Sequence, residues 1–296
     1  MWPLVAMENA LFGDPSLGWE RRCALVAEAG FAGIYAVPYP LADDDLVRLA
    51  ALDVVPARHG LRVAGVYANI DLALAPDAPW NARVRRLFEI IAGVSRVELS
   101  FKCSVPSREA PAWEEAIVAR LEPLLAVAER RGLEVALYPH SFYPLETVRE
   151  AERVVQRIAH PRLGFAFPVS HSYALCSAEE TARQLRACAN RLAGFNVCGC
   201  RRLAPQPPAK CAHFPPDEGD LEIAPLMAVL HEEGYRGDIV VQGHGWQGDL
   251  PGMLRRAAAY PGFRKEIAAS SLPREAVDRT APEARFPGAE SHHLTS

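Results

Sequence analysis

Four short apolar runs in this sequence end in side chains that could move a proton or bind a ligand. These ends are Tyr138-Pro-His140, Pro168-Val-Ser-His171, Cys198-Gly-Cys200 and Gln242-Gly-His244. Imidazole titrates near neutral pH, so histidines grouped at one site are suited to moving a proton between neighbouring carbon atoms of a substrate. None of the four ends contains a carboxylate, the side chain on which hard-metal sites and many proton-abstracting sites depend.

The segments that must position these side chains alternate between strand-like runs and amphipathic helical stretches. This alternation is typical of a parallel sheet whose strands are connected by helices. The expected strands are Leu4 to Met7, Gly33 to Val37, Arg62 to Tyr67, Arg96 to Phe101, Leu133 to Tyr138, Arg162 to Phe167, Leu192 to Cys198 and Asp238 to Gln242. Eight strand and helix pairs predict an α/β protein with a single (β/α)8 TIM barrel, whose catalytic residues lie at the carboxyl ends of the strands.

Changes in composition set the expected limits of the barrel. We expect it to cover residues 1–263, followed by a polar C-terminal extension over residues 264–296 that is peripheral or disordered. The stretch from Arg201 to Gly219 contains five prolines and shows no periodicity. It is therefore expected to be a long irregular loop after the seventh strand, on the face where barrels keep lids and substrate contacts.

The overall composition excludes several classes of partner. The 296 residues are 50% hydrophobic and carry a formal net charge of -4, so no basic field exists to attract nucleic acid or an anionic membrane. No uninterrupted apolar stretch reaches the roughly 18 residues of a membrane span. Seven cysteines are an odd count, which argues against a disulfide framework. We expect a soluble cytoplasmic protein with a small-molecule partner, and leave open whether it forms a homo-oligomer.

Period-2 alternation predicts which strand side chains face the barrel interior, because the outward face must be apolar to meet the helices. In the fifth strand this rule turns Tyr138 and His140 inward, and in the seventh it turns Asn196 inward. In the fourth strand, VELSFK, it turns Glu98 and Lys102 inward. Glu98 supplies the carboxylate that the strand ends lack, and its candidate partners are Lys102, one pleat higher, and other donors on adjacent strands.

Three segments in the second half of the chain resemble the xylose isomerase-like TIM-barrel superfamily. They are GLEVALYPH, PRLGFAFPVSH and the run from Asp220 through LEIAPLMAVLHEEGYRGDIVVQGHG, within a match from about Glu20 to Tyr260. The resemblance, which is nearest to a sugar phosphate isomerase and epimerase branch, implies a divalent metal held at four strand-end positions and a substrate contact at His171. In this chain the four metal positions are occupied by Tyr138, Pro168, Cys198 and Gln242. The usual metal ligands are therefore substituted.

The first functional hypothesis is a sugar or sugar-derivative isomerase or epimerase that transfers a proton next to a carbonyl, with weak or no metal dependence. His140 and His171 are the candidate acid and base, and Glu98 is the alternative base. Gln242 is neutral, so it can bind a hydroxyl or carbonyl oxygen but cannot act as a base. Tyr138 can donate a hydrogen bond or fill the space that a metal would take. The candidates for substrate binding are Lys102, Tyr138, Asn196, Arg201, Gln242 and His244.

Two alternatives belong to other functional classes. The barrel could be a non-catalytic member that has lost its metal and binds a carbohydrate or a partner protein. It could also hold zinc and perform lyase or hydrolase chemistry, since thiolates together with imidazole suit zinc. The zinc ligands would be Cys198, Cys200, Cys211 and His213, in a C-x-C-x10-C-x-H spacing that is not a common finger pattern.

The residue types of the strand ends also limit the cofactors and the nucleic-acid chemistry that we expect. We otherwise expect no cofactor, because a hard Mg²⁺ or Mn²⁺ site would need several oxygen ligands and the strand ends offer few. A divalent metal stays open if Glu98 or Glu8 contributes a ligand. An apurinic endonuclease is excluded, since such enzymes need several metals and a basic DNA-binding face.

Overall fold

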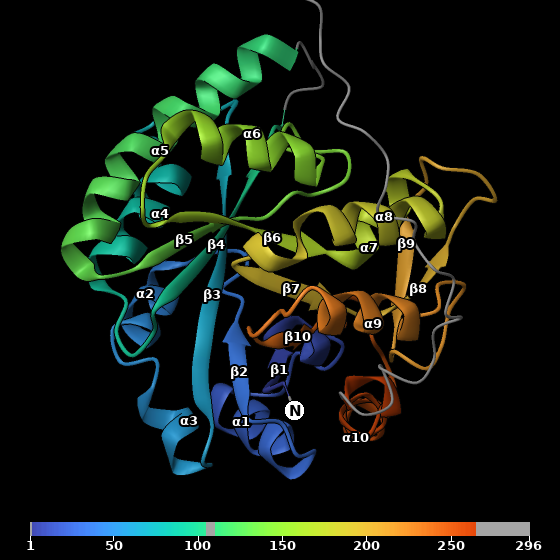
Figure 1. Ribbon diagram of the computed structural model, residues 1–296. Coiled ribbons are helices and arrows are strands. Elements are labelled where there is room, and N and C mark those ends of the chain that lie inside the picture. Colours follow the sequence, from blue (N-terminus) through green and yellow to red (C-terminus); the bar gives the residue numbers. More distant parts are fainter. Residues whose placement is uncertain (1, 105–109, 265–296) are drawn as a thin grey trace, which may run out of the picture.

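The computed structural model describes residues 2–104 and 110–264. Parallel strands close into a barrel (Figure 1), which confirms the predicted single (β/α)8 architecture. Around the ring the order is β1 (Leu4–Met7), β10 (Ile239–Val241), β7 (Gly194–Val197), β6 (Leu163–Pro168), β5 (Glu134–Leu137), β4 (Arg96–Lys102), β3 (Arg62–Asp71) and β2 (Gly33–Ala36). The expected C-terminal extension lies, apart from Arg264, outside the described residues.

Helices connect the strands and cover the outside of the barrel. They are α1 (Trp19–Glu28), α2 (Asp43–Leu49), α3 (Val54–Arg58), α4 (Pro79–Ile90), α5 (Ala110–Arg131), α6 (Val148–Ile158), α8 (Ala178–Cys188), α9 (Ala224–Glu232) and α10 (Leu250–Ala258), with short 3-10 turns at Glu8–Leu11, Ala189–Arg191 and Pro261–Phe263. Helix α6 begins at a capping box, in which Thr147 and Glu150 each accept a hydrogen bond from the other's backbone N–H. No helix in the described part of the chain is long and apolar enough to cross a membrane.

Two hydrophobic layers stabilise the barrel, one outside the ring of strands and one inside it. The outer layer packs strand side chains such as Val97, Leu99 and Phe101 against the helices. The inner layer consists of side chains on the opposite faces of the strands, namely Val5, Met7, Tyr35, Val37, Ala64 and Val240. Glu98 and Ser100, which alternate with the outer residues of β4, are also buried, so the predicted alternation of this strand is confirmed.

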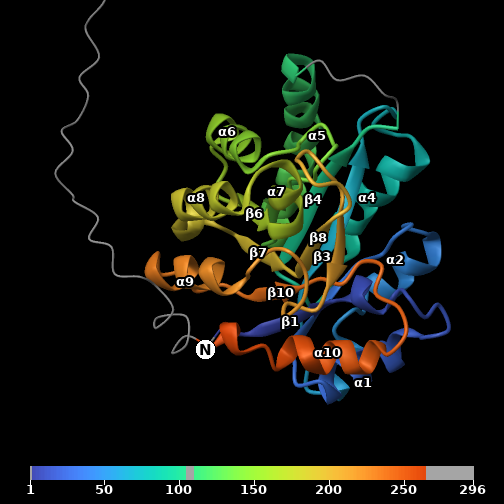
Figure 2. The same ribbon diagram turned by 90° about the vertical axis from the view of Figure 1, so that its right-hand side faces the viewer.

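The stretch expected as an irregular loop from Arg201 to Gly219 contains a β-hairpin, so that prediction is wrong. Strand β8 (Gly199–Arg202) pairs with the antiparallel strand β9 (Cys211–Phe214). Three of the five prolines lie between the two strands and the other two directly follow β9. None therefore occupies a position where a backbone N–H must hydrogen-bond to the other strand. The hairpin lies beside the barrel strands in Figure 1 and in front of them in Figure 2, and it forms a sheet of its own.

A short helix, α7 (Val169–Leu175), follows β6 directly and was not anticipated from the sequence. Most of its seven residues are buried, so it has no polar face that would reveal a helical period. The helix carries Ser170 and His171 at the carboxyl end of β6.

Candidate active site

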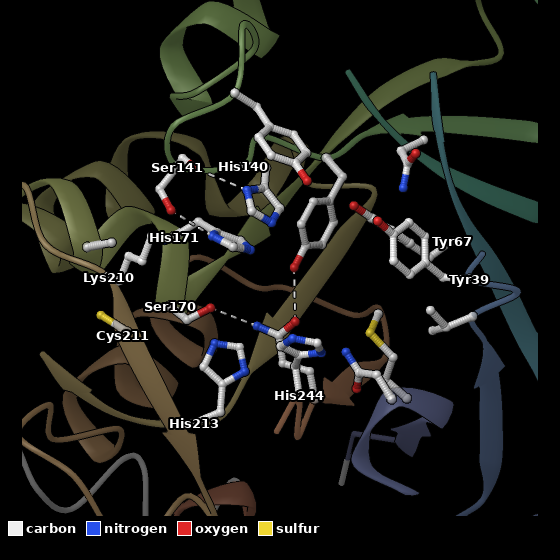
Figure 3. Close-up of a pocket in the computed structure, with 18 of the residues that line it drawn as sticks. Tyr39, Tyr67, His140, Ser141, Ser170, His171, Lys210, Cys211, His213 and His244 are labelled. Carbon is white, nitrogen blue, oxygen red and sulfur yellow. Dashed lines mark hydrogen bonds between the residues drawn. The ribbon is translucent and has the colours of Figure 1, made fainter. Parts of the chain in front are cut away.

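The carboxyl ends of the barrel strands surround a cavity of about 510 Å³. Three of the four strand ends singled out in the sequence line it, through Tyr138, His140, His171, Gln242 and His244. Figure 3 shows that His140, His171, His213 and His244 lie around the same space. The fourth strand end, which contains Cys198 and Cys200, is fully buried beside the cavity.

His140 and His171 form a closely packed pair in the cavity wall. The centroids of their rings are 3.7 Å apart, and Tyr143 stacks on the other side of His140 at 3.9 Å. The Nδ1–H of His140 donates to the Ser141 carbonyl at 2.9 Å, because a carbonyl oxygen can only accept. The Ser141 hydroxyl lies 3.0 Å from Nδ1 of His171. The Nε2 atom of the neutral His140 ring is thus left with a lone pair that can accept a proton.

Burial keeps both rings of this pair uncharged at neutral pH. It lowers the pKa of His140 to about 4, although the hydrogen bond to the Ser141 carbonyl acts in the opposite direction. Burial, together with the neighbouring His140, lowers the pKa of His171 well below its usual value. The pKa of His244 is lowered as well, by burial and by His213. A neutral imidazole is the form that can act as a general base.

A chain of neutral hydrogen bonds crosses the cavity from β5 to β10. The hydroxyl of Tyr138 donates to Oε1 of Gln242 at 2.9 Å. Nε2 of Gln242 in turn donates to the hydroxyl of Ser170 at 2.9 Å. Tyr138 is 3% exposed and Gln242 is 2% exposed, so these bonds satisfy buried polar groups.

The residues at this site do not fit a hard divalent metal. Pro168 has no donor side chain, and the polar atoms of Tyr138 and Gln242 are engaged with each other. Burial also raises the pKa of Tyr138 well above 10, so its phenolate is not accessible. None of the described residues that line the cavity is an Asp or a Glu, whereas Mg²⁺ and Mn²⁺ prefer carboxylate oxygens.

Cys198 and His213 change each other's pKa beside the cavity. The Sγ atoms of Cys198 and Cys200 are 3.6 Å apart. Burial by itself would raise the pKa of Cys198, but the hydrogen bond from Cys200 and the nearby His213 lower it overall. Burial would lower the pKa of His213, but the charge of Cys198 and their hydrogen bond raise it overall. The pair therefore favours a thiolate beside an imidazolium, with the imidazolium in the cavity wall.

The four proposed zinc ligands are only partly brought together. Cys198 and Cys200 are adjacent and His213 contacts Cys198, while Cys211 lies in the cavity wall opposite Arg202, two residue pairs along the hairpin from His213. Across residues 2–104 and 110–264, no group of three or more His, Cys, Asp or Glu side chains is arranged to hold a metal ion. The zinc alternative stays a hypothesis.

Glu98 lies inside the barrel, below the cavity rather than in its wall. It is completely buried, and Nδ2 of Asn196 donates to both of its carboxylate oxygens at 3.1 and 3.2 Å. Burial raises the pKa of Glu98 to about 7, and the bond from Asn196 and the charge of Arg96 limit the rise. Ser100, two residues farther along β4, bonds to the hydroxyl of Tyr67 at 2.6 Å, and Tyr67 lines the cavity.

Three of the remaining candidates, Lys102, Arg201 and Asn196, lie away from the cavity wall. The expected contact between Lys102 and Glu98 is wrong, because Nζ of Lys102 lies 3.9 Å from the ring centroid of Trp80. A cation over an indole face is stabilised by the ring quadrupole. Arg201 is exposed on the hairpin and lies over the ring of Phe214. Asn196 is occupied with Glu98, as described above.

Several residues that line the cavity were not identified from the sequence. They are Asn9, Tyr39, Tyr67, Asn69, Ser141, Tyr143, Ser170 and Lys210, together with His213, which was considered only as a zinc ligand. Alternation along a longer third strand would have turned Tyr67 and Asn69 inward, since β3 continues to Asp71. The stretch after the seventh strand was expected on this face, but no local signal identified Tyr39 or showed which hairpin residues reach the mouth.

Comparison with known proteins agrees with the barrel fold. The model of the family described as "Xylose isomerase-like TIM barrel" matches residues 23–259. No curated protein matches the chain.

Solved structures of similar fold cover most of the chain. An L-ribulose 3-epimerase has a TM-score of 0.69 and 17% identity, and the match covers 90% of this chain and 96% of that one. A xylose isomerase-like TIM barrel protein from Mycobacterium smegmatis in complex with magnesium has a TM-score of 0.66 and 17% identity, covering 92% and 98%. The 3-keto-D-glucoside 4-epimerase from E. coli has a TM-score of 0.67 and 16% identity, covering 87% and 97%. At these identities the likeness shows the fold alone.

Proposed function

Since this chain belongs to the xylose isomerase-like TIM-barrel family, we propose that it is a sugar or sugar-derivative isomerase or epimerase. In this proposal the protein moves a proton next to a carbonyl group, with weak or no dependence on a divalent metal. The observation that carries the proposal is the packed pair of neutral imidazoles, His140 and His171, in the wall of a cavity of about 510 Å³. The sugar-epimerase titles of similar structures support the substrate class by analogy.

The proposed reaction begins with a neutral imidazole removing a proton from the carbon next to the substrate carbonyl. The base becomes an imidazolium, and the electron pair of the broken C–H bond forms an enediolate. Because the rings of His140 and His171 are 3.7 Å apart, a proton taken by one can be returned to the adjacent carbon from the same side. The proton of the neighbouring hydroxyl passes to the oxygen of the former carbonyl, so that an aldose becomes a ketose. Epimerisation needs an acid on another side of the substrate, and His244 is the candidate.

The remaining polar side chains of the cavity would bind the substrate. Tyr67, Ser141 and Ser170 present hydroxyl groups that can exchange hydrogen bonds with a sugar. The negative charge of the enediolate oxygen would be stabilised by a fixed positive group in a site of low dielectric constant. His213 suits this role, since Cys198 raises its pKa and it lines the cavity.

The test is hydrogen exchange from D2O into a panel of aldoses and ketoses, followed by NMR in the presence of EDTA. His171→Ala should lower the exchange rate by roughly 10²- to 10⁴-fold, the contribution typical of a general acid or base. His59→Ala is the matched control, because His59 contacts Glu20 and precedes β3 at the opposite end of the barrel. Its exchange rate should equal that of the wild type.

Three outcomes would count against the proposal. Full exchange activity in His171→Ala would remove the assigned base. Binding of a sugar without any exchange would favour the non-catalytic carbohydrate-binding alternative. Stoichiometric zinc in purified protein, with loss of thermal stability on chelation, would favour the thiolate-zinc alternative.

A further inference from the structure

The loop after β5 contains an unusual residue at a tight turn. The backbone N–H of Tyr143 donates to the His140 carbonyl at 3.0 Å, which closes a four-residue turn with Phe142 at its third position. Phe142 has a φ of 69°, in the left-handed region. Glycine or asparagine normally takes this position, because a bulky side chain is disfavoured there.

The turn alone does not explain why a phenylalanine stands at this position. A glycine would allow the same backbone conformation without strain. The Phe142 side chain is 50% exposed and lines the cavity, so its burial contributes little free energy to offset the backbone strain. Strained residues that persist beside a ligand cavity commonly serve the ligand. An exposed aromatic ring at the mouth of a cavity is suited to packing against an apolar group.

A second exposed aromatic ring lies at the same mouth. Tyr39, which follows β2, is 52% exposed and also lines the cavity. In the strand ring β2 and β5 are separated by β3 and β4, so the two rings approach the mouth from different sides. Figure 3 shows Tyr39 across the cavity from His140 and Ser141, the residues that precede Phe142.

The charges and size of the cavity limit the kind of ligand further. Among its described lining residues, Lys210 is the single Lys or Arg and is exposed at the rim, and the other positive group, His213, is already assigned to the enediolate oxygen. Phosphate groups are usually bound by several converging donors or an Arg fork rather than one mobile lysine. The volume of about 510 Å³ falls in the range of pockets that hold drug-sized ligands, so it exceeds the needs of a single hexose ring.

We propose that the mouth between Phe142 and Tyr39 binds an apolar substituent of the sugar, so that the ligand is an uncharged sugar derivative that keeps its carbonyl group, rather than a free or phosphorylated monosaccharide. The sugar ring lies in the polar part of the cavity beside His140 and His171, and the substituent packs between the two aromatic rings. The inference rests on the proposed function in one respect, namely that the cavity holds a sugar.

The experiment compares the binding of three probes by isothermal titration calorimetry: 4-nitrophenyl β-D-glucoside, D-fructose and D-fructose 6-phosphate. The wild type should bind the aryl glycoside most tightly. Phe142→Gly should reduce the affinity for the aryl glycoside, relative to that for fructose, about tenfold, since the aromatic contact is lost. Its melting temperature should stay equal or rise, because glycine removes the strain at this φ. Phe142→Tyr, which keeps a ring, should retain the preference.

Leu203→Ala is the matched control, because Leu203 is 67% exposed on the hairpin and does not line the cavity. Its binding of all three probes should equal that of the wild type. An unchanged preference for the aryl glycoside in Phe142→Gly would overturn the inference, as would tighter binding of the sugar phosphate by the wild type. Tight binding of the aryl glycoside by a protein that exchanges no proton into any aldose or ketose of the panel would refute the proposed function and leave this inference standing.

Discussion

The chemistry proposed for this protein depends on how burial changes individual side chains. His140 and His171 are kept neutral by desolvation, while His213 lies beside a thiolate that favours its charged form. Four histidines in one cavity thus differ in charge because their neighbours differ, and not because of the residue type. Glu98 is a further case, since its burial raises the pKa to about 7.

Glu98→Gln should stabilise the protein at pH 8. In the wild type a carboxylate whose pKa is about 7 in the folded state and 4.5 in the unfolded chain must ionise inside the barrel. This cost, on the order of 3 kcal/mol, is fully present above pH 7 and disappears as the pH falls towards 4.5. A glutamine can also donate to Oδ1 of Asn196, which has no hydrogen-bond partner.

The measurement for Glu98→Gln is urea denaturation at pH 5 and pH 8. Glu134→Gln is the control, because Glu134 is exposed and pairs with Arg96. It should show no such gain at pH 8. Glu98→Gln should also keep its proton-exchange activity, as Glu98 does not line the cavity. Loss of activity without loss of stability would instead make Glu98 the base.

At the scale of elements, the site depends on segments that do not belong to the repeating strand and helix pattern. The β8–β9 hairpin brings His213 and Lys210 to the cavity, and α7 brings Ser170 and His171. The turn after β5 positions Ser141 so that its carbonyl bonds to His140 and its hydroxyl bonds to His171. The barrel strands provide a rigid ring, and these short insertions complete the wall above it.

Gly199→Ala should displace the hairpin and weaken the site. A Cβ at Gly199 would lie 2.1 Å from the Glu218 carbonyl oxygen and 2.2 Å from that of Pro215, both backbone atoms that cannot turn aside. We expect the free energy of unfolding to fall by about 1 to 3 kcal/mol, and ligand affinity to fall as His213 moves.

Chemical denaturation and calorimetric binding measure these two effects of Gly199→Ala. Gly18→Ala is the control, since a Cβ there meets no atom within 4 Å. It should lower stability by about 0.5 to 1 kcal/mol, because alanine is a poorer N-cap of α1 than glycine, and it should leave ligand affinity unchanged. Equal stability of the Gly199 and Gly18 variants would show that the hairpin can move without cost.

At the scale of the whole molecule, the closed barrel separates an outer from an inner hydrophobic layer. Polar groups are buried inside the barrel together with the inner layer. The inner layer around Tyr35 and Val240 lies below the cavity, where Glu98 and Asn196 are also buried. The folded state therefore holds several titratable groups out of water at once. Its stability should depend on pH through their sum.

Stability should fall as the pH is lowered from about 6.5 to about 4. The histidines take up protons near pH 6.5 in the unfolded chain, whereas the pKa of His140 is about 4 in the folded protein and that of His171 is lower than usual. The unfolded state binds more protons in this window, by up to about 1.4 kcal/mol per pH unit for each such histidine. Glu98 acts in the opposite direction between pH 7 and 4.5.

A series of urea denaturations from pH 7 to pH 4 measures this dependence. It is best carried out on Glu98→Gln, which removes the opposing contribution. Adding His140→Asn should flatten the curve, because one buried neutral histidine is then absent. A slope that does not change on adding His140→Asn would mean that His140 is protonated at the same pH in the folded and unfolded states.

The sequence by itself determined the barrel, the face that carries the site, and the inward direction of residues such as Glu98 and Tyr138. These follow from local periodicity and from the rule that parallel strands present their carboxyl ends at one edge. Both depend on residues that are close together in the sequence. Only the tertiary structure decided which side chains meet. Tyr138 and Gln242 are 104 residues apart, and Asn196 and Glu98 are 98 residues apart.

The same physical reason separates the predicted site from the observed one. The hairpin that adds His213, and the desolvation that keeps His140 neutral, arise from contacts across the closed barrel. A single sequence records the residue types at these positions but not the distances between them. The strand ends therefore located the site, and the packing of the whole chain decided the charge that each group carries there.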